Sequence, residues 1–273
     1  MKKMLLIILL FLVSCGDQNS NSTVKNIESS AVEIITEKKM WIKLLQNKDK
    51  TVSIIDVNLN KAWVSFWWLV QDWKFYKKMY GVDLMSNFQK NDKIFWVVNW
   101  AFFLDVQGKN KTGLSFPIKS EWIRMYRDKK LFEATEIKED YVDNEIPKRT
   151  LVITIDWNAK IFEWYNKEYL ENKNYSEVTV AFSPDVTARR NAEIWRSYIG
   201  LKCKKDICNN MIFFVADNKT QADMDKIIAD YWVSRANIIM MDWWPSAQFS
   251  YIWEDKTFYW KWWVPQFNII YEK

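Results

Sequence analysis

The chain has 273 residues, no histidine, and 39 Lys and Arg against 34 Asp and Glu, which gives a formal net charge of +5. The missing imidazole excludes Ser-His-Asp and Cys-His catalysis and histidine-ligated metals, so acid–base chemistry falls to Asp, Glu, Tyr, Lys or Cys. Positive and negative charges are mixed along the chain without a long basic stripe, which argues against nucleic acid as a partner.

Tryptophan and glycine have exchanged their usual abundances. The chain contains 18 Trp and 5 Gly, whereas glycine averages about 7% of a protein. Many of these Trp residues follow Asp or Asn or form doublets, which are turn positions that favour glycine; the doublets are Trp67-Trp68, Trp243-Trp244 and Trp262-Trp263. The pattern predicts that most of these residues are glycine in the native protein, through a UGA codon that some bacteria read as Gly. The alternative is a truly Trp-rich protein with aromatic platforms for sugars.

The first residues predict export and lipidation. Residues 1–14 combine Lys2 and Lys3 with a short apolar run, which is typical of a signal peptide and too short to span a bilayer. The run ends in Leu-Val-Ser-Cys, which resembles a bacterial lipobox, so Cys15 is the predicted lipidation site and membrane anchor. A plain signal peptide or a core helix is the alternative. Residues 15–30 are polar and predict a flexible tether, and residues 31–273 one main domain. The expected location is extracytoplasmic, on a bacterial membrane.

Runs of β-branched and aromatic residues between turn residues predict a strand-rich domain. The predicted strands are Val52–Val57, Lys93–Val98, Glu121–Tyr126, Leu151–Ile155, Val178–Phe182, Ser197–Leu201, Met211–Ala216, Asn237–Met241 and Gln248–Ile252. Helical spacing predicts a helix over Thr220–Tyr231, preceded by Asp217 or Asn218 as cap and followed by Trp232 where glycine is usual, and a second over Val82–Phe88. The predicted class is α+β, with a large mixed or antiparallel sheet packed against few helices.

Two cysteines follow Cys15. Cys203 and Cys208 flank a short loop between two predicted strands, so a disulfide is expected outside the cytoplasm, and two free thiols are the alternative. A zinc site is not expected, because there is no histidine and no second cysteine pair. No cofactor is expected, although an oxygen-ligated divalent cation stays open.

Three motifs carry a family resemblance when glycine is read for tryptophan. Val97–Phe103 becomes V-V-N-G-A-F-F, Trp195–Leu201 becomes G-R-S-Y-I-G-L, and Ile238–Gln248 becomes I-I-M-M-D-G-G-P-S-A-Q. In this order, they resemble the phosphodiester glycosidase family, to which the lysosomal uncovering enzyme belongs. The resemblance covers roughly residues 52–272. It implies an enzyme that cleaves the bond between the anomeric carbon and a phosphate oxygen.

The same motifs predict the candidate catalytic residues. Asp242 follows an apolar strand and is the carboxylate expected to act on the glycosidic oxygen or a water, Arg196 offers a guanidinium for the phosphodiester, and Asn99 is expected to position the sugar. Each has a structural alternative: a turn cap for Asp242, an ion pair for Arg196 and a turn residue for Asn99.

The residues expected to bind substrate lie around those three. The loop after Asp242 can present backbone N–H groups to phosphate oxygens if its Trp pair is glycine. The predicted substrate-binding residues are Trp100, Phe103, Asp185, Ser197, Trp243, Trp244 and Ser246. Core packing for Phe103, a turn hydroxyl for Ser246 and a solvated loop around Asp185 are the alternatives.

The sequence therefore predicts an envelope-anchored hydrolase that releases a sugar from a sugar-1-phosphodiester or an envelope glycan. The alternative function is a non-catalytic lipoprotein that binds glycan or an anionic envelope polymer.

Overall fold

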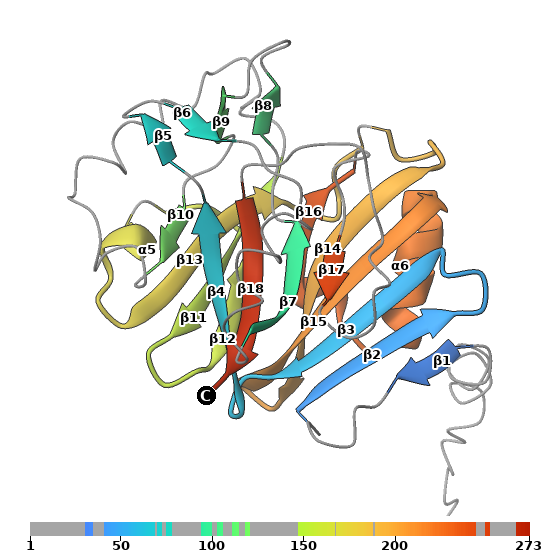
Figure 1. The fold of residues 1–273 in the computed structure, drawn as a ribbon, viewed down its shortest axis with the longest axis horizontal. Coiled ribbons are helices and arrows are strands. Elements are labelled where there is room, and N and C mark those ends of the chain that lie inside the picture. Colours follow the sequence, from blue (N-terminus) through green and yellow to red (C-terminus); the bar gives the residue numbers. More distant parts are fainter. Residues whose placement is uncertain are drawn as a thin grey trace, which may run out of the picture.

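The computed structural model describes residues 31–34, 41–68, 70–72, 75–77, 94–99, 103–105, 111–114, 118–120, 147–166, 168–187, 189–243, 249–251 and 266–273. Within these residues the strands form three sheets (Figure 1). Neighbouring strands within each sheet are antiparallel.

The largest sheet has ten strands. Its order is β1 (Ala31–Ile34), β2 (Ile42–Asn47), β3 (Val52–Asn58), β15 (Ile207–Lys219), β14 (Ile194–Lys204), β16 (Ile238–Asp242), β13 (Tyr175–Phe182), β11 (Lys148–Thr154) and β12 (Ala159–Phe162), with β10 (Ile118–Ser120) beside β13. Strands β14 and β15 are its longest, and every residue from Met211 to Ala216 is buried, as the apolar run predicts.

Two smaller sheets complete the fold. The first has the order β17 (Phe249–Tyr251), β7 (Ile94–Asn99), β18 (Gln266–Glu272) and β4 (Ala62–Trp68), and it lies across one face of the large sheet (Figure 1). The second has the order β5 (Val70–Asp72), β6 (Phe75–Lys77), β9 (Lys111–Leu114) and β8 (Phe103–Asp105), and it lies at the top of the view.

The large sheet separates two hydrophobic cores. On one face, Val64 and Phe66 of β4 pack with Ile199 of β14, so this core fills the space between the two sheets. On the other face, Met224 and Ile228 of helix α6 (Gln221–Asp230) pack with side chains such as Tyr198 and Phe214. Because successive side chains of a strand point to opposite faces, neighbours such as Tyr198 and Ile199 belong to different cores.

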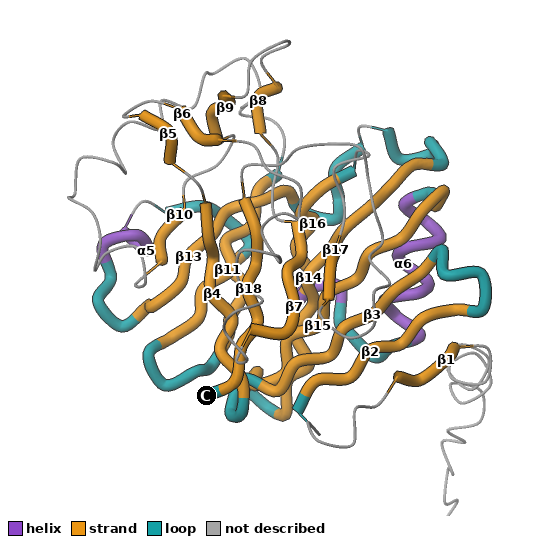
Figure 2. Tube along the Cα trace, in the orientation of Figure 1, coloured by secondary structure: helices purple, strands orange, loops and turns teal. Residues whose placement is uncertain are grey.

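The predicted α+β class is wrong, and the fold is mainly β. Among the described residues, the α-helices are only α5 (Glu168–Glu171) and α6, and one turn of 3-10 helix, η2 (Arg235–Asn237), follows α6 (Figure 2). The layer that covers the front of the large sheet is a second sheet, where helices were expected. The sequence-based interpretation predicted β7 and β17 of this layer but did not recognise the Trp-rich β4 or β18 as strands, so the second sheet was not expected. None of the described helices has the length and apolarity to cross a bilayer.

Most predicted strands are confirmed, as β3, β7, β11, β13, β14, β15, β16 and β17. The strand predicted at 121–126 and the helix at 82–88 lie outside the described residues. Helix α6 is confirmed, but its cap is Thr220, whose hydroxyl accepts from Asp223 N at 3.1 Å while Asp223 accepts from Thr220 N at 3.0 Å. Asp217 and Asn218 belong to the preceding strand.

Two Trp residues have a backbone conformation that favours glycine. Trp157, in the turn after β11, has φ 66°, and Trp232, directly after the Tyr231 cap of α6, has φ 59°. Left-handed backbone costs an L-residue roughly 1–2 kcal/mol and is unusual for a bulky side chain. The Trp157 ring also lies 3.7 Å from that of Trp63, centroid to centroid, whereas aromatic pairs prefer about 4.5–7 Å. Both features support the hypothesis of native glycine at these positions.

Cys203 and Cys208 form a disulfide that closes the hairpin between β14 and β15. The bridge lies at the end of these strands that is remote from Ile194 and Lys219, which pair at their other end.

We expect the Trp232→Gly variant to be more stable than Trp232→Ala by about 0.5–1 kcal/mol, because only glycine relieves the left-handed strain. In the unmodified protein the Lys202 ammonium lies 5.7 Å from the centroid of the Trp232 ring. Both variants lose this contact, so it does not affect the difference in stability between them. Urea unfolding of the two variants measures the difference. An alanine variant as stable as the glycine variant would contradict the strain.

Candidate functional site

A β-bulge aims Asp242 into the space between the two sheets. Ser197 of β14 is paired with Asp242 of β16, and the next residue, Tyr198, is paired with Met240, so Met241 is the extra residue of the bulge. Ser197 is also paired with Val215 of β15, which packs in the core between the sheets. Residues directly opposite on antiparallel strands share a face, so Ser197 and Asp242 both face the second sheet.

These two side chains are buried and adjacent. Asp242 is 1% exposed and Ser197 is 2% exposed. The Ser197 hydroxyl has no hydrogen-bond partner among the described residues. A buried hydroxyl is normally hydrogen-bonded, so Ser197 Oγ beside Asp242 retains its capacity to bind a further polar group. Trp243, the next residue, points to the opposite side, where its ring stacks on Phe182 with centroids 5.0 Å apart.

The second sheet brings Asn99 to the same end of the sandwich. Asn99 ends β7 and is paired with Phe267, and its neighbour Val98 is paired with Phe249, the first residue of β17. Only residues 243–248 join Asp242 to Phe249, a distance of at most about 25 Å even when fully extended. Phe103 begins β8 and is paired with Leu114. Trp100, Trp244, Ser246 and Cys15 lie outside the described residues.

The structure does not bring Arg196 together with Asp242. Arg196 is paired with Ala216, which belongs to the core beneath α6, so its side chain lies on the opposite face from Ser197. The fully buried guanidinium donates to the carbonyl oxygens of Lys219, Arg189 and Ala192 at 2.8, 2.6 and 3.1 Å. In this position Arg196 supports the 189–192 turn from behind the sheet.

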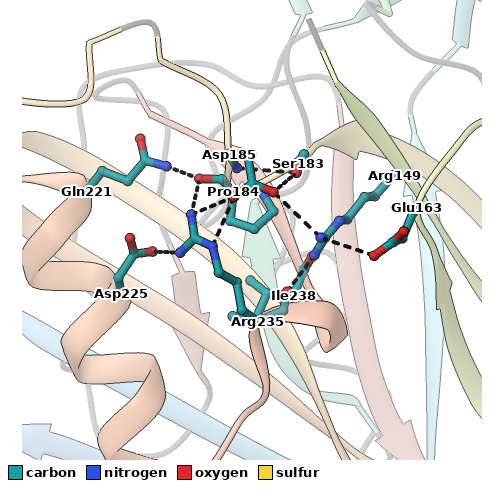
Figure 3. Close-up of polar contacts among 9 residues, drawn as sticks. All are labelled: Arg149, Glu163, Ser183, Pro184, Asp185, Gln221, Asp225, Arg235 and Ile238. Carbon is teal, nitrogen blue, oxygen red and sulfur yellow. Dashed lines mark hydrogen bonds and ion pairs between the residues drawn. The ribbon is translucent and has the colours of Figure 1, made fainter.

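Asp185 takes part in an ion-pair network (Figure 3). Its carboxylate accepts from Ser183 Oγ at 2.9 Å and lies 2.9 Å from Arg235 Nη2 and 3.7 Å from Arg149 Nη2. Partial burial raises the pKa of Asp185, but the hydrogen bonds from Ser183 and Arg235 outweigh it and hold the pKa below its ordinary value. Arg235 also pairs with Asp225 of α6 at 2.7 Å. The network fastens the Ser183–Asp185 turn to the helix side of the molecule.

Sequence reasoning missed a buried carboxylate that joins the two sheets. Glu177 of β13 is 2% exposed, and it accepts from Phe66 N at 2.9 Å, Ser120 Oγ at 2.9 Å and Ser65 Oγ at 3.2 Å. Three donors from two other strands make this a strong attachment for a carboxylate. The sequence did contain a signal, because side chains two and four residues apart on a strand share a face. Glu177 therefore shares the face of the buried Thr179 and Ala181, which packs against the second sheet.

A second missed carboxylate is Asp217, near the end of β15. It lies two residues beyond Val215 and therefore on the face of Ser197. Partial burial raises its pKa, an effect only partly offset by a backbone hydrogen bond from Asn218, the charge of Lys219 and the side chain of Trp195. In the described part of the chain, no group of three or more acidic or cysteine side chains is arranged to hold a metal ion.

Comparison with known proteins supports the fold but gives no family. No family model and no curated protein matches the chain. A solved structure, the catalytic domain of zebrafish N-acetylglucosamine-1-phosphodiester alpha-N-acetylglucosaminidase auto-inhibited by its pro-peptide, matches with a TM-score of 0.50 and 14% identity, covering 89% of this chain and 81% of that one. A hypothetical protein from Synechocystis matches with a TM-score of 0.42 and 7% identity, covering 89% of this chain and 61% of that one.

We expect Glu177→Ala to lower the free energy of unfolding by about 1–3 kcal/mol, because it leaves buried donors of β4 and β10 without an acceptor. Glu177→Gln keeps one oxygen acceptor and should lose less. Urea denaturation of both variants tests this, with the exposed Asp206→Asn as control. Equal stability of Glu177→Ala and the unmodified protein would show that the tie between the sheets contributes nothing.

The chain therefore has a fold similar to that of the catalytic domain of a phosphodiester glycosidase.

Proposed function

We propose that the protein is an envelope-anchored hydrolase that cleaves a sugar-1-phosphodiester at the glycosidic bond. The observation that carries the proposal is the buried pair of Asp242 and Ser197 at one end of the sandwich, in a fold similar to a phosphodiester glycosidase domain. Asn99, at the corresponding end of β7, supports it because the backbone places a polar residue near the same edge.

In this reaction water attacks the anomeric carbon and the carbon–oxygen bond to phosphate breaks. Asp242 accepts the proton from water, as a buried and positioned carboxylate can. The unpaired Ser197 hydroxyl donates to a phosphate oxygen, and backbone N–H groups of the 243–246 loop add donors if Trp243 and Trp244 are glycine. The products are a free sugar and a phosphomonoester. Arg196 and Asp185 act from outside this site by holding the loops behind it.

Anchoring and glycine recoding belong to the same proposal. Cys15 would carry the lipid, and the polar residues up to 30 would form the tether to the domain. The left-handed backbone of Trp157 and Trp232 supports native glycine at positions outside the site.

We expect Asp242→Asn to reduce turnover of a hexose-1-phosphodiester by about 10²–10⁴-fold, because the amide cannot accept the proton. Release of free sugar measures the rate, and Asp206→Asn, in the exposed hairpin turn, is the matched control. An Asp242→Asn variant with full activity would exclude this role.

We expect the native protein to carry glycine at positions 243 and 244. Mass spectrometry of the peptide spanning residues 238–249, purified from the source cells, reads both positions directly. Tryptophan at both would contradict the recoding and would favour the alternative function, a lipoprotein that binds glycan without cleaving it. Binding of the phosphodiester without release of sugar would support that alternative as well.

A further inference from the structure

Asp217 lies beside the Ser197–Asp242 pair on the same face of the large sheet. Ser197 is paired with Val215, and Asp217 follows two residues later. Beyond this point a bulge sets residues 217 and 218 against Trp195, since Arg196 is paired with Ala216 and Ile194 with Lys219. Asn218 has φ 48°, and the Asp217 N–H donates to the Thr51 carbonyl at 2.8 Å. The backbone of Asp217 is thus held on one side by Thr51, just before β3, and lies on the other side in the bulge opposite β14.

One carboxylate oxygen of Asp217 has no partner. Its Oδ1 is buried and accepts no hydrogen bond among the described residues. The Ser197 hydroxyl, on the adjacent strand, is in the same condition. Two buried polar atoms without partners on one face are uncommon in a folded protein, because each costs the desolvation of a polar group. Together they indicate a site at which a polar ligand would form hydrogen bonds with both atoms.

The surroundings of Asp217 shift its pKa upward. Partial burial raises its pKa, whereas the Asn218 N–H, Lys219 and the Trp195 side chain lower it by less. Arg196 lies on the opposite face of the sheet and Asp242 lies across Ser197 on β16. A neutral carboxyl group can approach a phosphodiester anion without charge repulsion and can donate a proton to it.

We propose that Asp217 is the proton donor to the departing phosphate oxygen, an inference that rests on the proposed hydrolase function. As the bond from the anomeric carbon to this oxygen breaks, the carboxyl proton of Asp217 moves to the oxygen. Water forms the new bond to the anomeric carbon and gives its proton to Asp242. Sugar and phosphomonoester leave, and the proton on Asp242 returns to Asp217 through water, which restores both groups. Asp242 thus acts as the general base and Asp217 as the general acid.

The pH dependence has a defined sign. Asp217 must be protonated to act, so kcat/KM falls as the pH rises through its pKa, which lies above that of an ordinary Asp. Asp217→Asn should remove this basic limb and lower the rate on the phosphodiester by about 10²-fold or more. A structural role would lower the rate without removing the limb.

A second substrate separates acid catalysis from a folding defect. The fluoride of the same sugar leaves without needing a strong acid, so Asp217→Asn should lose less than about tenfold on it. The assays use the full chain with the residues found in the native peptide at 243 and 244, and Asp206→Asn is the control. If Asp217→Asn does not fold, the basic limb of the unmodified protein is the second test.

The outcomes distinguish the two proposals. An active unmodified protein, with Asp217→Asn as fast as Asp206→Asn or equally impaired on both substrates, overturns the role of Asp217 and leaves the hydrolase function standing. An unmodified protein without a basic limb overturns the role of Asp217 too. An unmodified protein that releases no sugar from any phosphodiester overturns both proposals.

Discussion

The pairing of β14 with β15 on one side and β16 on the other is the constraint on which the candidate site depends. It sets Ser197 between Val215 and Asp242. Because side chains alternate along a strand, a slip of one residue would move the whole polar set to the other face. The bulge at Met241 is equally important, since without the extra residue Asp242 would face α6. The site is therefore a product of register more than of any single contact.

The two faces of the large sheet carry different sets of polar contacts. On the helix face, buried Arg196 and the ion pairs of Asp185 hold the loops from residue 183 to 192. On the other face, Glu177 ties β13 to β4 and so fixes the second sheet that carries Asn99. Among the described residues, Glu177 thus accepts three hydrogen bonds on the face where Ser197 Oγ and Asp217 Oδ1 have no partner.

Sequence patterns predicted the strands and the helix whose apolar residues recur at regular spacing. The strands at Met211–Ala216 and Ile238–Met241 and the helix that begins after Thr220 were recovered because burial on one or both faces leaves a regular pattern. Two strands of the second sheet, β7 and β17, were predicted, but β4 was missed because its Trp residues were interpreted as glycine, which weakens a strand pattern.

The direction in which the site side chains point could not be predicted from the sequence. The adjacent Arg196 and Ser197 were assigned to one site, yet alternation puts them on opposite faces. A bulge has no reliable signature in a single sequence, so the orientation of Asp242 could not be derived. Glu177 was overlooked, and Asp217 was considered only as a helix cap, because their contacts come from strands far away in the chain.

The disulfide between Cys203 and Cys208 has a consequence for motion. It ties β14 to β15 at one end of the hairpin, whereas Ser197 and Asp217 lie toward the other end. Two strands joined covalently at one end separate first from the end that is free, so the lowest-energy local openings of this pair are confined to the neighbourhood of the candidate site. Amide hydrogens along the two strands should exchange in a gradient, fastest near Ile194 and Lys219 and slowest near the bridge. The disulfide thus restricts local opening of this strand pair to the end at which the candidate site lies.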